Sequence, residues 1–296
     1  MFALPTDPPL TPPVFPLHPT VAGPADGRPI VFLHGMALTR TMWAPQMEAL
    51  ADEFRVISLD LPGHGELAGM RYSLDGACEV VAEAIRLAGG PTILSGSGGT
   101  GGSPVGGADE SADRSGDLSY RKPVIVGLSM GGYTALEFAH RHPEMTAGLV
   151  LASCSAEGRG PLAFPYHAAA WLSARPTVRW LDWLNLLFIR LTVRKPYREP
   201  MLLGGSYSAA TPEVVQGITT QDWASKLAEY PGPVLILNGQ LDLAFRKDEK
   251  RWRAAAQHGR LQVIPWAGHL SNMHRPGKFT EAVRGFAEEL GSAKSE

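Results

Sequence analysis

The sequence predicts an α/β protein in which helices flank a mostly parallel sheet. Three observations support this fold class: short runs of Val, Ile and Leu, segments of helical periodicity between those runs, and glycine or proline turns that separate the two. Continuous apolar runs are typical of strands that are covered on both faces, as in a parallel sheet. The alternation of such strands with helices is typical of doubly wound folds.

Six apolar runs are predicted to form the strands. They occupy residues 29–33, 55–59, 123–126, 147–151, 233–237 and 261–264. Five segments whose apolar residues recur with helical spacing are predicted to form helices, at residues 41–51, 74–87, 132–140, 248–257 and 278–290. Strands and helices therefore alternate along most of the chain.

A glycine-rich insertion interrupts this alternation at residues 89–122. It holds seven glycines among the thirteen residues 95–107, a composition that disfavours both a helix and a packed strand. The insertion is therefore predicted to be a loop within the core domain.

A second interruption, at residues 155–230, is rich in aromatic residues and has helical periodicity. Within residues 177–193 the polar side chains recur near a 3.6-residue spacing and leave a wide apolar face. We predict that this segment is a helical cap, inserted into one catalytic core formed by residues 1–154 and 231–296.

Composition and charge exclude several classes of protein. Of the 296 residues 44% are hydrophobic, which is enough for a core, and 27 basic residues against 29 acidic ones leave no basic excess for nucleic acid. Cys78 and Cys154 cannot form a disulfide framework. No cluster of His, Asp, Glu or Cys has metal-ligand spacing, so no metal is expected, and no other cofactor is predicted. No apolar stretch spans a bilayer, and the proline-rich N-terminal segment lacks the Lys or Arg of a signal peptide. A cytoplasmic protein without a membrane partner is predicted.

The strongest chemical signal is the sequence Gly-Leu-Ser-Met-Gly-Gly at residues 127–132, which follows a predicted strand and precedes a predicted helix. A G-x-S-x-G turn in this context is a nucleophile elbow, in which a strained turn exposes the serine hydroxyl. The start of the following helix supplies backbone N–H groups beside that serine. Ser129 is therefore the candidate nucleophile.

With this motif, the sequence from about residue 15 onward resembles the α/β-hydrolase superfamily. In the family's order, the resemblance implies that Asp242 in Gly-Gln-Leu-Asp is the triad acid and that His269 in Ala-Gly-His is the base. It also implies an oxyanion hole made by the backbone N–H groups of Met36 and Met130. The turn from Asp60 to Gly65, which matches the D-x-x-G-x-G motif, is interpreted as structural.

Two features of the glycine-rich insertion imitate functional motifs. Residues 96–101 match the dinucleotide fingerprint G-x-G-x-x-G. The residues after them, however, cannot begin the helix whose N-terminus would bind the pyrophosphate. Residues 91–99 align with the strand and elbow at an offset of 32 residues, which places Ser97 opposite Ser129. Ser97 has no following helix, and Ser129 is therefore preferred.

The function predicted from these motifs is hydrolysis of a carboxylic ester or lactone through an acyl-enzyme. The residues around His269 and the elbow are similar to those of 3-oxoadipate enol-lactonases and related small carboxylesterases. Five aromatic residues are expected to line a pocket for an apolar acyl or aromatic small molecule, unless they only attach the cap to the sheet: Trp43, Trp171, Trp180, Trp183 and Phe188.

Other functions remain open on the same triad. They are a thioesterase, a carbon–carbon bond hydrolase, a cofactor-free haloperoxidase, and a ligand receptor on a hydrolase scaffold. The oligomeric state is left open between a monomer and a dimer.

Overall fold

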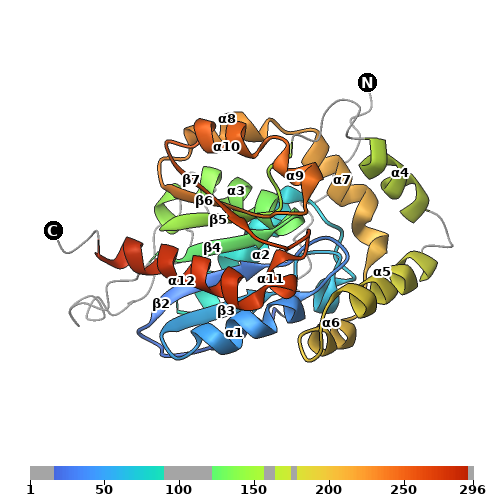
Figure 1. The fold of residues 1–296 in the computed structure, drawn as a ribbon, viewed down its shortest axis with the longest axis horizontal. Helices are drawn as coiled ribbons and strands as arrows, with labels where there is room; N and C mark the ends of the chain where they lie inside the picture. Colours follow the sequence, from blue (N-terminus) through green and yellow to red (C-terminus); the bar gives the residue numbers. More distant parts are fainter. Residues whose placement is uncertain (1–16, 90–121, 157–163, 175–178, 293–296) are drawn as a thin grey trace, which may run out of the picture.

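A seven-stranded sheet forms the centre of the protein (Figure 1). The computed structural model describes residues 17–89, 122–156, 164–174 and 179–292. The strands are β1 (Thr20–Ala22), β2 (Arg28–Leu33), β3 (Phe54–Leu59), β4 (Val124–Leu128), β5 (Gly148–Ala152), β6 (Pro233–Gly239) and β7 (His258–Ile264). Their spatial order is β1-β3-β2-β4-β5-β6-β7, and every neighbouring pair is parallel except β1 with β3. The predicted α/β fold with a mostly parallel sheet is confirmed.

The six predicted strands are all present, and two differences concern the edges of the sheet. β1 was not predicted because its three residues make no apolar run. β7 begins earlier than predicted, at His258, and its side chains alternate between exposed and half-buried positions. This alternation follows from its edge position, because an edge strand is covered less completely than a central one.

The central strands send alternate side chains into two separate cores. Ile30 and Val124 belong to one core, and their neighbours Val31 and Ile125 belong to the other. Strand side chains point alternately to opposite faces, so strands without polar positions bury both faces. Each face therefore needs its own layer of helices.

Helices cover both faces. The first core is covered by α1 (Ala44–Leu50) and α12 (Pro276–Ser292), and the second by α2 (Leu74–Leu87), α3 (Met130–Arg141), α8 (Trp223–Glu229) and α10 (Glu249–Ala255). Short helices complete the loops: η1 (Arg40–Trp43), η2 (Gly65–Leu67), η4 (Pro143–Met145), η6 (Ser208–Ala210), α9 (Leu243–Arg246) and α11 (Ser271–His274). No helix in the described parts of the chain is long and apolar enough to cross a membrane.

Four helices between β5 and β6 stand beside the sheet rather than on its faces, at the right of Figure 1. These inserted helices are α4 (Phe164–Ser173), α5 (Arg179–Thr192), α6 (Arg198–Gly204) and α7 (Thr211–Thr219). α8 follows them but packs against α3 and α10. Of the predicted glycine-rich insertion, residues 90–121, which include Ser97 and the dinucleotide-like motif, lie outside the described residues.

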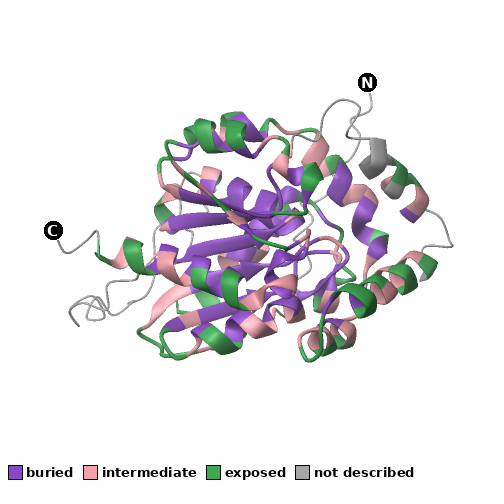
Figure 2. Cartoon of the chain, in the orientation of Figure 1, coloured by how far each residue is buried: buried purple, intermediate pink, exposed green. Residues whose placement is uncertain are grey.

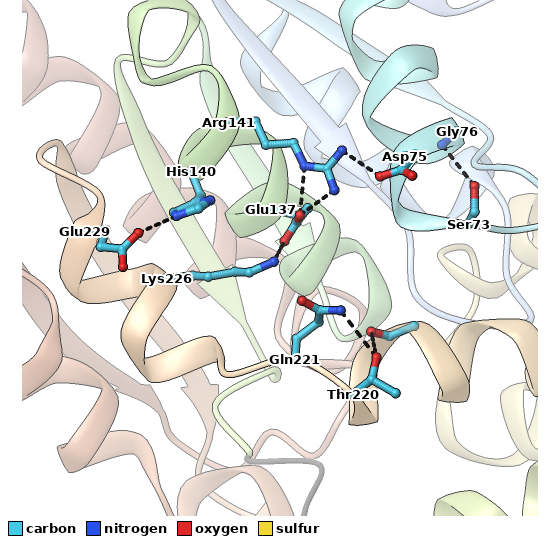
Figure 3. Close-up of polar contacts among 11 residues, drawn as sticks. Ser73, Asp75, Gly76, Glu137, His140, Arg141, Thr220, Gln221, Lys226 and Glu229 are labelled. Atoms are coloured by element: carbon cyan, nitrogen blue, oxygen red, sulfur yellow. Dashed lines mark hydrogen bonds and ion pairs between the residues drawn. The ribbon is translucent and has the colours of Figure 1, made fainter.

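A buried carboxylate joins the helices of the second core (Figure 3). Glu137 on α3 is almost fully buried and accepts hydrogen bonds from Arg141 on the same helix and from Lys226 on α8. Arg141 also pairs with Asp75 at the start of α2, with 2.7 Å between the charged atoms. Glu137 therefore ties α3 to α8, and Arg141 extends the network to α2.

We expect Glu137→Ala to lower the free energy of unfolding by about 3 kcal/mol, because it leaves Lys226 and Arg141 without a buried partner. Glu229→Ala is the matched control, since Glu229 pairs with His140 but is two-thirds exposed. Its loss should cost less than about 0.5 kcal/mol. Urea unfolding of both variants tests this, and equal losses would contradict it.

Candidate active site

Ser129 occupies a tight turn between β4 and α3. Its φ of 55° and ψ of −119° lie outside the conformations that a non-glycine residue adopts readily. The turn persists because the ends of neighbouring strands hold it, as in the 2.8 Å hydrogen bond from the backbone N–H of Ser129 to the carbonyl of Ala152.

The glycines around Ser129 are required by close backbone approach. A Cβ atom at Gly127 would overlap the carbonyl group of Gly131, and one at Gly131 would overlap the carbonyl group of Leu33. Both overlaps involve backbone atoms, which cannot turn aside as a flexible side chain can. The sequence G-x-S-x-G at this place is therefore a steric requirement for bringing β4 into α3 in a single turn.

Asp242 and His269 lie together at the carboxyl ends of β6 and β7. Nδ1 of His269 is 3.0 Å from Oδ2 of Asp242, whose side chain is buried, and the N–H at Nδ1 donates to this carboxylate. The ring of Phe245 packs on the ring of His269 at a centroid distance of 4.6 Å, and Phe245 also lines a pocket together with Ser129. No hydrogen bond joins Ser129 to His269 among the described residues, and such contacts commonly tighten when substrate binds.

The pocket beside Ser129 holds about 420 Å³ of empty space, part of it open to solvent, and has a mainly apolar wall. It is lined by Met36, Ser129, Met130, Tyr133, Ala156, Val214, Val215, Ile218, Thr219 and Phe245. The hydroxyl of Tyr133 donates to the carbonyl of Ala156, at 2.7 Å. None of the described lining residues carries a charge. The wall can therefore pack against an apolar ligand, but it has no counter-ion for a charged one.

None of the five aromatic residues expected to line the substrate pocket belongs to the described wall of this pocket. Trp43 is fully buried in the first core between Phe32 and Phe279, at ring centroid distances of 4.9 and 5.7 Å. The other four have exposed side chains on α4 and α5 and are absent from the described pocket wall: Trp171, Trp180, Trp183 and Phe188. The inserted helices instead reach the pocket through aliphatic residues of α7, which helical periodicity alone did not single out.

Two buried histidines brace the loop that carries Met36. His34 follows β2, and its Nε2 accepts from the backbone N–H of Leu61 at 2.9 Å. His64 lies in the loop after β3, and its Nε2 accepts from the backbone N–H of Ala37 at 3.1 Å. Each Nδ1 contacts a carbonyl in its own loop, so both rings are neutral with the proton on Nδ1. Each loop thus holds a backbone group of the other.

This brace needs the histidines to stay uncharged. Burial lowers the pKa of His64 to about 3, with the nearby His34 as the second cause, and burial likewise lowers the pKa of His34. A proton on Nε2 would replace an acceptor by a donor opposite a backbone N–H. The sequence predicted only that the turn holding His64 is structural, and the role of the two histidines emerges from the pairing of loops 27 residues apart.

The lowered pKa predicts a pH-dependent stability. Between pH 6.5 and about 3 the unfolded chain protonates His64 whereas the native chain does not, so the free energy of unfolding falls as the pH falls through this window. Above pH 6.5 His64 is neutral in both states, so it no longer makes the free energy of unfolding depend on pH. From pH 7 to pH 5 the wild type should lose about 2 kcal/mol more than His64→Gln, which keeps an acceptor but does not titrate. Urea unfolding at both pH values measures the difference, and parallel losses would contradict it.

A second polar network fixes the segment that follows β6. The side-chain amide of Asn238 donates to Ser155 Oγ and to the buried carboxylate of Glu249, at 2.8 and 3.1 Å. Ser155 in turn donates to the carbonyl of Phe245 at 2.7 Å, and Arg246 pairs with Glu249. The turn that carries Asp242 is therefore tied to the end of β5 and the start of α10.

His274 is another contact that sequence analysis missed. Its Nδ1 accepts from the backbone N–H of Gly268 at 3.0 Å, next to His269. Burial lowers the pKa of His274, with His269 as a further cause. His274, five residues after the candidate base and at the end of the short helix α11, therefore holds the loop of that base in place.

The parallel sheet, the serine between strand and helix, and the adjoining acid–histidine pair define a hydrolase class of α/β enzymes. A family model described as the alpha/beta hydrolase family matches residues 30–282, and the chain belongs to this family. The predicted membership of the superfamily is confirmed, and the coarse class of the protein is hydrolase.

Curated relatives match over nearly their whole length. The chain is 24% identical to 3-oxoadipate enol-lactonase 1 of Acinetobacter baylyi, covering 91% of this chain and 92% of the relative. It is 23% identical to a pimeloyl-[acyl-carrier protein] methyl ester esterase of Nitrosospira multiformis, with coverages of 88% and 95%. A thermophilic esterase from Thermogutta terrifontis is similar in structure, with a TM-score of 0.68, 25% identity and 93% coverage of each chain.

Proposed function

We propose that the protein hydrolyses a carboxylic ester or lactone through an acyl group on Ser129. The observation that carries this proposal is the placement of Ser129 on a strained turn at the wall of an apolar pocket, with Phe245 linking that pocket to the Asp242–His269 pair. The relatives support the reaction class, since they include a lactonase and esterases.

Acylation begins when Ser129 Oγ attacks the carbonyl carbon of the ester while Nε2 of His269 takes the hydroxyl proton. The hydrogen bond between Nδ1 and Asp242 fixes the ring tautomer and balances the charge that develops on it. The backbone N–H groups of Met36 and Met130 stabilise the oxyanion. The carbon–oxygen bond to the leaving group then breaks, and His269 returns the proton to that oxygen.

Deacylation repeats these steps with water. His269 takes a proton from a water molecule, the hydroxide attacks the acyl carbon, and Ser129 leaves with the proton that His269 gives back. An ester yields an acid and an alcohol. A lactone yields one hydroxy acid, because its leaving oxygen stays attached to the acyl chain.

The pocket wall favours a neutral apolar acyl or aromatic group. Val214, Val215 and Ile218 on α7 form an aliphatic wall near Ser129, and no described lining residue pairs with a carboxylate. Some relatives are named for substrates that carry carboxylates, such as the (E)-2-((N-methylformamido)methylene)succinate hydrolase of Acinetobacter baylyi. We therefore propose for this chain an uncharged acyl group in place of a dicarboxylate.

Esters of graded acyl length test the pocket. Ile218→Trp should lower kcat/KM for p-nitrophenyl hexanoate about tenfold more than for the acetate, because the larger side chain fills the aliphatic end of the pocket. Gln216→Trp is the matched control, since Gln216 lies on the same helix with an exposed side chain. An equal loss for both esters, or indifference of the wild type to acyl length, would count against an apolar acyl pocket.

Trapping the intermediate tests the mechanism separately. After rapid acid quenching, the mass of the peptide that contains Ser129 should increase by the acyl group of the ester supplied. Thioesters and carbon–carbon substrates assayed beside the esters separate the alternative reactions. Turnover of a carbon–carbon substrate with no ester turnover would overturn the proposal, as would an acyl group found on another residue.

A further inference from the structure

The solvent side of α5 carries a continuous apolar face. It consists of Trp180, Trp183, Leu184, Phe188 and Leu191. Trp183 is 61% exposed and Leu191 is 77% exposed, while Ile189, on the opposite side of the helix, is fully buried. Residues three, four and eight positions apart lie on one side of a helix, so these side chains form one stripe. We call it the α5 apolar face, and Figure 2 shows α5 at the edge of the molecule with exposed residues along it.

Two further large apolar side chains are exposed on other inserted helices. Leu203 on α6 is 88% exposed, and α6 packs directly against α5. Trp171 on α4 is also exposed. Single exposed apolar residues are common, but a stripe that runs along a complete helix is typical of an interaction surface.

A basic cluster adjoins the α5 apolar face. It consists of Arg190, at the margin of the stripe, and of Arg194 and Lys195 directly after α5. All three are exposed, and none forms an ion pair within the described parts of the chain. Residues 179–203 hold five basic and two acidic side chains, whereas the whole chain has a formal charge of −2. The positive charge is therefore concentrated beside the apolar stripe.

The sequence predicted no membrane partner, but on this surface we propose that the protein binds an anionic lipid surface peripherally, with α5 lying in the plane of the headgroups. An amphipathic helix with Trp and Phe on one side and Arg or Lys at its margin is suited to that position. Tryptophan is favoured there because its ring is apolar and its N–H is polar. The basic cluster adds attraction to anionic headgroups, at close range in physiological salt.

A second copy of the chain fits this surface less well. Two-fold pairing places the same patch of each subunit against the other. Pairing through the α5 apolar face with the two helices parallel would bring two basic clusters together, and like charges across an interface are unfavourable. With the helices antiparallel, each cluster would face the other stripe, which has no acidic residue to pair with it. An anionic lipid surface complements both the stripe and the cluster.

Vesicle co-sedimentation tests the charge requirement. The full chain should bind phosphatidylcholine–phosphatidylglycerol vesicles and bind pure phosphatidylcholine vesicles much more weakly, and added salt should weaken its binding. Arg190→Glu/Arg194→Glu/Lys195→Glu should bind the anionic vesicles about a hundredfold more weakly. Lys250→Glu/Arg251→Glu/Arg253→Glu makes the same change of charge on exposed residues of α10 and should bind as the wild type does.

The apolar requirement has its own variants. Trp183→Gln/Phe188→Gln should lose vesicle binding, whereas Val21→Gln/Leu87→Gln, which removes two exposed apolar side chains elsewhere, should retain it. Thermal unfolding checks that each variant is folded. Undiminished binding of either α5 variant would overturn the proposal, as would a dimer in size-exclusion chromatography that the Trp183→Gln/Phe188→Gln variant dissociates. Because binding is measured without turnover, the result is independent of the proposed hydrolysis.

Discussion

Ser129→Ala should lower kcat for ester hydrolysis by about 10⁴- to 10⁶-fold, because the variant retains the pocket but has no oxygen nucleophile. KM should change far less, since Ser129 is one of ten described residues on a largely apolar pocket wall. Labelling by a fluorophosphonate probe should disappear together with turnover. A steady-state assay with p-nitrophenyl butyrate, made at enzyme concentrations high enough to detect the residual rate, measures the loss.

Ser97→Ala is the matched control for this variant. The sequence offers Ser97 as a second serine in a similar setting of strand and glycines, 32 residues before Ser129. Its substitution should leave both kcat and probe labelling unchanged. If Ser97→Ala abolished turnover while Ser129→Ala retained it, the assignment of the nucleophile would be wrong.

The strands were predictable because burial on both faces requires an uninterrupted run of apolar residues, which the local sequence shows. Residues 29–33 contain no polar position, and β2 places alternate side chains in two cores. The elbow was predictable for a related reason. A Cβ atom at residue 127 or 131 would overlap backbone atoms, so glycine is needed at both positions. Local sequence therefore indicated both the sheet and the serine.

The pocket was not predictable in the same way. Trp43 lies in a helical segment with an apolar periodicity, but periodicity does not distinguish a residue packed on the sheet from one that lines a pocket. The brace of His34 and His64 depends on the spatial pairing of two loops, to which no local pattern corresponds. Residues that act through partners distant in the sequence become visible only when the chain is folded.

Asp242→Asn should lower kcat by about 10⁴-fold, because the amide neither fixes the His269 tautomer nor balances a positive ring. The geometry should be retained, since the turn is also held by Asn238 and Glu249. Asp222→Asn is the matched control: Asp222 accepts from the backbone N–H of Ser225 at the start of α8, away from the pocket wall. This control should stay within about twofold of the wild type, as surface substitutions usually do.

The double variant Ser129→Ala/Asp242→Asn decides whether the two residues act as one unit. If Asp242 serves the serine through His269, its loss has no further effect once the nucleophile is gone, and the double variant should be no slower than Ser129→Ala alone. Independent contributions would instead multiply, and the rate would fall by about another 10⁴-fold. Single-turnover assays of the three variants compare these outcomes directly. If the losses of rate multiply, Asp242 does not act through Ser129. Its hydrogen bond with His269 would then serve to hold the loops after β6 and β7 in place.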